Sequence, residues 1–202
     1  MRDSAIVKYR VDARNSLVFV NEAWIAEAEA VPQPDLAAPA VIGQGLWNLI
    51  TDLPLQHIFD GLFQRLRTRQ IPSVTYRFRC DTPTARRLHQ LTITPLPDEA
   101  LEFQTQIVAV DARPHARLLD ATVPRSQDLL RMCSWCKRIP VPGRGWLEIE
   151  EALDHHPTFD VAPLPALTHG ICPTCERRML KLLAEPTAAG GDVATFGNWS
   201  ED

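Results

Sequence analysis

Two pairs of cysteines constrain this chain more than any other feature. Cys133 and Cys136 form one C-x-x-C motif, and Cys172 and Cys175 form another. A two-residue spacer lets a tight turn direct both sulfurs at one ion, and a second turn completes a tetrahedron, so the pattern predicts a metal site, usually zinc. The 35 residues between Cys136 and Cys172 exceed the common zinc-ribbon spacing. We therefore expect this insertion to carry structure of its own.

We predict that Cys133, Cys136, Cys172 and Cys175 bind a structural zinc ion. Four thiolates leave no position for a reactive water, so we expect no catalysis by the metal. Since no enzyme motif is present elsewhere in the chain, we also predict no catalytic residue. A metal-free thiol redox switch, an iron–sulfur cluster and disulfides remain alternatives. His169 lies three residues before Cys172, where it either supports the site or replaces one cysteine ligand.

Composition narrows the class of protein. The chain has 202 residues, a net charge of -4 and 23% charged residues, which is typical of a globular protein that has no electrostatic preference for nucleic acid or anionic membranes. No apolar run is long enough to span a membrane, and residues 1–4 lack an apolar signal core. We expect a cytoplasmic protein, in which reduced cysteines favour metal or redox chemistry.

The N-terminal half alternates between strand and helix signals. Two short runs, 5–10 and 17–20, predict strands, and Asn21 can cap a following helix. Apolar residues at helical spacing predict a longer helix over 55–68, and period-2 patterns predict three more strands between 74 and 110. The fold class is therefore α+β, with a five-stranded antiparallel sheet carrying helices on one face.

The opening of this half resembles a PAS domain. The residues that carry the resemblance are Val11-Asp12-x-x-Asn15-x-Leu17-Val18-Phe19-Val20-Asn21-x-Ala23-Trp24, a pattern of strand, turn, strand and capped helix. The resemblance covers residues 5–113. It implies a sensor or interaction module that holds a small ligand between sheet and helices, although neither the pocket ligand nor the cofactor-binding residues follow from the sequence.

The C-terminal half contains the four paired cysteines. We predict a linker over 114–125 and a short helix over 127–132, capped by Ser126, that leads into Cys133. Pro173 suits the first turn of a helix that runs to Ala184, which places the second cysteine pair at the amide-rich end of that helix. Between the pairs, 146–149 reads as a strand and 150–156 as a helix.

Residues 132 to about 183 resemble a cysteine-rich module that follows PAS domains in bacterial signalling proteins. The marks of the module are Cys-x-x-Cys-Lys-Arg-Ile, Trp-Leu-Glu-Ile-Glu-Glu and Thr-His-Gly-Ile-Cys-Pro-x-Cys, and all three are present. The resulting scheme is a PAS-like domain over 5–113, a linker over 114–125, a zinc module over 126–184 and a disordered tail over 185–202.

We assign structural roles to the fifth cysteine, to one histidine and to a group of arginines. Cys80 alternates with apolar residues, so we expect it to pack in the sheet core. His57 is expected to be structural rather than a haem ligand. Arginines gather around one predicted hairpin, where we expect a solvated face: Arg77, Arg79, Arg86 and Arg87.

These observations favour a regulatory protein over an enzyme. The sequence contains no phosphate-binding glycine loop, nucleophile elbow or kinase signature, so we expect output through a protein partner or a homodimer, with no membrane association. One alternative is a thiol-based redox or metal sensor. A second is nucleic-acid binding through the basic residues of the zinc module: Lys137, Arg138, Arg144, Arg177, Arg178 and Lys181.

Overall fold

The computed structural model describes residues 5–30, 37–50, 52–155, 163–184 and 194–195. The chain divides into two compact units. Unit 1 comprises Met1–Arg77, Gln90–Ile107 and Leu180–Asp202, and unit 2 comprises Phe78–His89 and Val108–Met179. We describe each unit by itself.

Unit 1 is built on an antiparallel sheet with the strand order β2-β1-β5-β4-β3. The strands are β1 (Val7–Val11), β2 (Leu17–Val20), β3 (Val74–Arg79), β4 (Ala85–Pro95) and β5 (Leu101–Ala112). The predicted five-stranded antiparallel sheet is therefore confirmed. A two-residue strand, β10 (Ala194–Thr195), adds a sixth member parallel to β3. The prediction of disorder is wrong for those two residues, and the rest of 185–202 lies outside the described residues.

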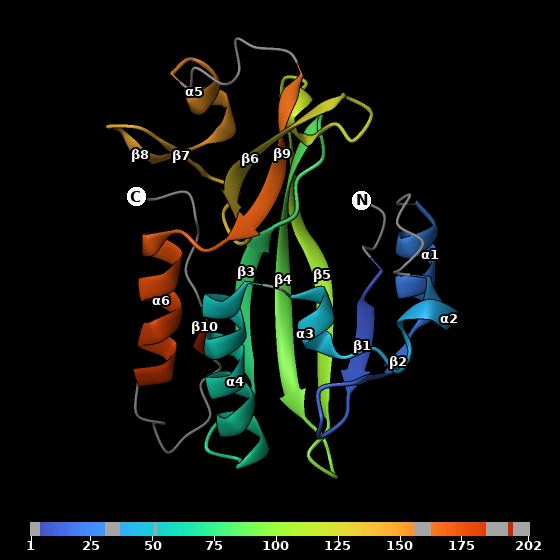
Figure 1. Cartoon of the computed structure of the whole chain (residues 1–202). Coiled ribbons are helices and arrows are strands. Elements are labelled where there is room, and N and C mark those ends of the chain that lie inside the picture. Colours follow the sequence, from blue (N-terminus) through green and yellow to red (C-terminus); the bar gives the residue numbers. More distant parts are fainter. Residues whose placement is uncertain (1–4, 31–36, 51, 156–162, 185–193, 196–202) are drawn as a thin grey trace. The chain divides into compact units, whose positions relative to one another are not determined.

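The two predicted helices of unit 1, after Asn21 and over 55–68, are present together with two short helices (Figure 1). The helices are α1 (Glu22–Ala30), α2 (Ala38–Val41), α3 (Leu46–Leu49) and α4 (Leu53–Arg67). Asn21 Oδ1 accepts a hydrogen bond from Trp24 N at 3.1 Å, as expected of an N-cap. Asp52 caps α4 in the same way, through a 3.1 Å bond from Leu55 N. The helical spacing predicted over 55–68 becomes a stripe of buried side chains on α4.

Aromatic contacts show that the helices cover one face of the sheet. Tyr9 and Phe103 are register partners on β1 and β5, and their rings stack with centroids 4.4 Å apart. Trp24 of α1 meets Tyr9 edge-on at 5.3 Å, and Phe63 of α4 meets Phe103 at 5.6 Å. Because alternate residues point to opposite faces, Arg10 and Glu102 lie on the other face of the sheet, where they form an ion pair.

Unit 2 contains two small sheets and a buried apolar cluster. The strands β6 (Arg125–Cys133) and β9 (Leu164–Gly170) pair in parallel, and β7 (Ile139–Val141) and β8 (Gly145–Leu147) form a hairpin. A 3₁₀ helix (Arg117–Leu119), α5 (Ile149–Leu153) and α6 (Pro173–Ala184) complete the elements. The expected strand and helix between the cysteine pairs are thus present as β8 and α5, while His156 lies outside the described residues.

The predicted helix over 127–132 is wrong, because this segment is the strand β6. Its side chains alternate: Leu130 and Met132 are buried, whereas Leu129 is 72% exposed. This period of two is that of a β-strand. The backbone groups of β6 pair with those of β9, in place of the hydrogen bonds that a helix would form within itself.

The buried cluster of unit 2 consists of Ala116, Leu118, Leu130, Met132, Ile139, Val141, Ile149 and Ala152. Its first two members belong to 114–125, the segment predicted to be a linker. Both are at most 2% exposed, so this segment contributes to the apolar interior of unit 2. Within the described part of the chain, no helix has the length and apolar character needed to cross a membrane.

Candidate metal centre

The first cysteine pair lies on a tight turn at the end of β6. Cys133 is the last residue of the strand, and its backbone N–H donates to Arg138 O at 2.9 Å. Its carbonyl accepts from Lys137 N at 3.0 Å, and Lys137 adopts a φ of 61°. A non-glycine residue in this left-handed region is uncommon, and here it closes the turn that places Cys136 beside Cys133.

The second pair lies at the start of α6, as predicted. Cys172 directly precedes Pro173, and Glu176 N donates to Cys172 O at 2.9 Å, which begins the helix. Cys175 N points at Cys172 Sγ from 3.4 Å. The free amides of the helix N-terminus therefore face sulfur, which favours the thiolate form.

Parallel pairing of β6 and β9 brings the two cysteine pairs together. Cys133 and Gly170 are register partners, Ser134 N donates to Gly170 O at 2.7 Å, and Cys172 N points at Cys133 Sγ from 3.4 Å. Parallel strands cannot be joined by a tight hairpin and need a crossover of a dozen or more residues. The long spacing between the pairs is explained by this crossover, which contains β7, β8 and α5.

The side chain of Arg131 approaches Gly170 closely. A Cβ atom added at Gly170 would lie 2.1 Å from Arg131 Nε. The Arg131 guanidinium therefore packs against bare backbone two residues before Cys172.

The four sulfurs have the geometry of a closed metal site. Their ligand atoms all lie within 4.8 Å of one another, and each cysteine is at most 4% exposed. Cys136 Sγ and Cys172 Sγ are 3.7 Å apart. A tetrahedron with metal–sulfur bonds of about 2.3 Å has sulfur–sulfur edges of about 3.8 Å, whereas a disulfide needs about 2.05 Å. The cluster is compatible with a bound metal such as zinc.

Electrostatics also favour a cation among the sulfurs. Hydrogen bonds from the thiols of Cys136, Cys172 and Cys175, in that order, hold the pKa of Cys133 far below its usual range. Hydrogen bonds with Cys133, Cys136 and Cys172, in that order, raise the pKa of Cys175, and burial adds to the rise. One thiolate thus forms readily, but four negative charges at this spacing require a compensating ion.

Other predicted residues lie apart from this cluster or differ from expectation. His169 is exposed on β9 opposite Met132, and the group of ligand-capable side chains found within the described residues contains the four cysteines without it. Cys80 is only half-buried, and Arg87 Nη2 lies 3.8 Å from its sulfur, so the prediction of a core position is wrong. His57 is exposed on α4.

An extended set of ion pairs in unit 2 was not predicted. Asp81 and Arg113 are 3.1 Å apart, and both side chains are 0% exposed. Arg79, expected on a solvated face, is largely buried and pairs with Asp81 and Glu148. We call the following residues the ion-pair network: Arg79, Asp81, Arg86, Arg113, Arg138, Glu148 and Glu150. The pairs join positions as far as 69 residues apart, so no local pattern reveals them.

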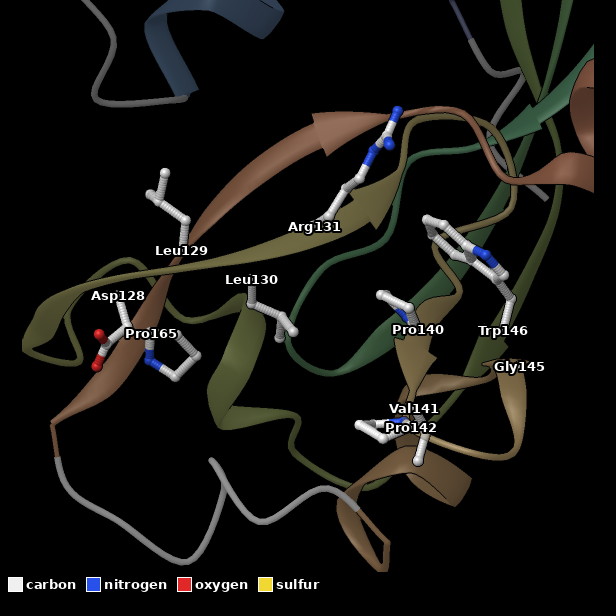
Figure 2. Close-up of a pocket in the computed structure, with 10 residues that line it drawn as sticks. All are labelled: Asp128, Leu129, Leu130, Arg131, Pro140, Val141, Pro142, Gly145, Trp146 and Pro165. Atoms are coloured by element: carbon white, nitrogen blue, oxygen red, sulfur yellow. The ribbon is translucent and has the colours of Figure 1, made fainter.

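A groove of about 580 Å³ lies between β6 and the β7–β8 hairpin. Figure 2 shows Leu130 directed toward this hairpin, while Pro140 and Trp146 form another part of the wall. Among the described residues, β6 belongs to a two-stranded sheet with β9, and Pro140 has no backbone N–H with which to extend that sheet. The groove therefore remains open and largely apolar.

Comparison with known proteins adds no assignment. The chain matches no protein-family model, and no curated protein matches it. The chemical interpretation of this chain therefore depends on the geometry of the cysteine cluster. That geometry is suited to holding a metal in a closed site.

Proposed function

We propose that this chain is a regulatory protein in which a PAS-like sensor or interaction domain is joined to a zinc-stabilised module. The single observation that carries the proposal is the buried cluster of four cysteines. Four sulfur ligands and no open position are typical of structural zinc sites. The zinc, when bound, would neutralise thiolate charge and hold the ends of β6 and α6 together.

The structure supports the sensor part through the order of elements in unit 1. Two strands, four helices and three further strands follow one another, which is the order on which the PAS resemblance depends. A helix layer over one face of an antiparallel sheet gives such a domain an interior in which a small ligand could be held. We propose that the response passes to a protein partner or a second copy of the chain.

A thiol redox switch is the second candidate function, and one distance favours it. Cys136 Sγ and Cys172 Sγ need to approach by less than 2 Å, from 3.7 Å to about 2.05 Å, to form a disulfide. Peroxide would oxidise one thiolate to a sulfenic acid with release of hydroxide, and the second thiolate would then displace a second hydroxide from the sulfenic sulfur to form the disulfide. A bound zinc ion would be released in this reaction.

The structure gives less support to nucleic-acid binding. Two of the basic residues that suggested it make internal contacts: Arg138 pairs with Glu148 at 3.2 Å, and Lys137 Nζ donates to Ser134 O at 2.9 Å. These charges are partly used inside unit 2. We therefore keep this alternative below the other two.

Metal content tests the proposal directly. We expect one zinc per chain, by elemental analysis and native mass spectrometry, in protein purified without added metal. Replacing Cys172 and Cys175 with serine should abolish binding, because two thiolates cannot hold the ion in a closed site. Cys80→Ser is the matched control and should keep the metal. Metal-free protein with four reactive thiols would contradict structural zinc and favour the redox switch.

A further inference from the structure

We propose that the ion-pair network couples the cysteine cluster to the β3–β4 turn, so that metal binding at the cluster orders residues 78–89. This inference rests on the metal site proposed above and adds a route by which the state of that site reaches a distant part of the chain. Every residue that carries the argument lies in unit 2.

The first link is a backbone contact. Arg79 is the last residue of β3, and its N–H donates to Trp135 O at 2.7 Å. Trp135 lies between Cys133 and Cys136, inside the metal-binding turn, and is 4% exposed. The end of β3 is therefore bonded directly to the turn whose shape the metal would fix.

The second link is Glu148, which joins two arginines through one carboxylate. Glu148 Oε2 lies 2.5 Å from Arg79 Nη1, and Oε1 lies 3.2 Å from Arg138 Nε. Arg138 follows the first cysteine pair by two residues, and Arg79 ends β3. A change in the position of the metal-binding turn therefore moves one partner of a carboxylate that also holds β3.

The network then continues around the turn. Asp81 binds both Arg79 and Arg113, while Glu150 binds Arg113 at 2.9 Å and Arg86 of β4 at 2.7 Å. Asp81 and Arg113 have no exposed side-chain surface. Because a buried charge that loses its partner is costly, these pairs favour a concerted arrangement over independent ones.

Some buried polar atoms of the ion-pair network have no hydrogen-bond partner. Arg113 Nε and Glu150 Oε2 are buried without a hydrogen-bond partner in the described structure. Arg113 Nη2 lies 2.9 Å from Glu150 Oε1 but in poor hydrogen-bond geometry, so that contact is an ion pair alone. Because these groups are incompletely hydrogen-bonded, the geometry of the ion-pair network depends on the residues packed around it. We therefore expect the network to change when the metal-binding turn changes.

Hydrogen exchange of the full chain tests the coupling. The unmodified chain, Glu148→Gln and the control Glu151→Gln are each measured with zinc and after chelation. Glu151→Gln removes an exposed charge on α5, the helix that begins directly after Glu148. In the unmodified chain, chelation should speed exchange of peptides covering 78–89 by about tenfold or more. Loaded Glu148→Gln should keep one zinc per chain yet already exchange faster in 78–89, and Glu151→Gln should match the unmodified chain.

Two measurements separate failure of the coupling from failure of the metal site. Absence of zinc by elemental analysis would overturn both proposals. If zinc is present and chelation exposes α6 while 78–89 is unchanged, the metal site stands and the coupling is wrong. Normal exchange of 78–89 in loaded Glu148→Gln would also overturn it. Since coupling is reciprocal, Glu148→Gln should release zinc to a competing chelator about tenfold faster, and an unchanged rate would contradict the proposal.

Discussion

The two units of this chain stabilise their interiors in different ways. Unit 1 packs large side chains, among them Phe63, Phe103 and Tyr76, between a long helix and a broad sheet. Unit 2 has an apolar cluster of eight residues, and beside it are four buried cysteines and the ion-pair network. Apolar burial is independent of solution chemistry to first order, whereas thiolates and ion pairs respond to metal, oxidant and pH. Unit 2 is therefore the more responsive region.

Removing the metal should produce the largest difference between the units. Structural zinc contributes on the order of 10 kcal/mol in small metal-binding modules, more than a cluster of eight side chains can replace. After chelation we expect amide protection to be lost in β6 and β9, while α4 in unit 1 keeps its protection. Hydrogen exchange followed by mass spectrometry measures both in one sample.

The control for this prediction is zinc added back to the chelated protein, which should restore β6 and β9 without changing α4. Equal loss of protection in α4 would show that the two units unfold together. Full protection in β6 without metal would show that the apolar cluster is sufficient. Either result would show that the two units do not differ in their dependence on the metal.

A core substitution in unit 1 should give the next largest effect and leave the metal in place. Phe63 is 1% exposed and contacts Trp47, Phe59 and Phe103. Phe63→Ala should lower the free energy of unfolding of unit 1 by about 3–5 kcal/mol, because it removes apolar burial and leaves a cavity. Denaturant unfolding of zinc-loaded protein measures the change, and elemental analysis should still find one zinc per chain.

The matched control lies at the start of the same helix. Leu53 is 73% exposed, so Leu53→Ala should change stability by less than about 0.5 kcal/mol. Similar effects of the two substitutions, or loss of zinc from Phe63→Ala, would contradict the view that unit 1 depends on its own apolar interior.

Local patterns predict the main elements of unit 1 because the signals for them lie within each element. Helix α4 follows the spacing of Ile58, Leu62 and Leu66, and Asn21 caps α1 as its side chain suggests. The cysteine ligands are equally local, since the chemistry of a C-x-x-C motif is contained in four residues. These features could be predicted before the structure.

The rest of unit 2 depends on partners far away in sequence. Strand β6 was predicted as a helix because the adjacent pair Leu129-Leu130 obscures the alternation, and the strand becomes evident only from pairing with β9, about 35 residues further along. Arg79 was expected on a solvated face, yet it is paired with Glu148, 69 positions away in the sequence. A single sequence contains no local signal for such pairs.

The smallest predicted effect is a pH dependence of the stability of unit 1, caused by Glu102 on the sheet face opposite the helices. Burial raises the pKa of Glu102, but hydrogen bonds from Arg10 and Gln104 outweigh it, so the pKa lies below its usual value. A carboxyl group with a lowered folded-state pKa stabilises the fold above its unfolded pKa, about 4.3, and loses this contribution as pH falls through the folded value. Glu102→Gln should therefore cost about 1 kcal/mol at neutral pH and progressively less in acid.

The comparison is made on unit 1 alone, because acid also protonates the cysteines of unit 2. Exchange-derived stability of β1 and β5, corrected for intrinsic rates, should differ between the unmodified chain and Glu102→Gln at neutral pH and converge in acid. Glu27→Gln, an exposed substitution on α1, should show no such convergence. A difference that persists undiminished in acid would mean that Glu102 acts through packing. The effect of Glu102→Gln on stability is expected to be small because its partner Arg10 is 44% exposed, and solvent screens an exposed ion pair. Charge therefore contributes little to unit 1, which relies on apolar burial.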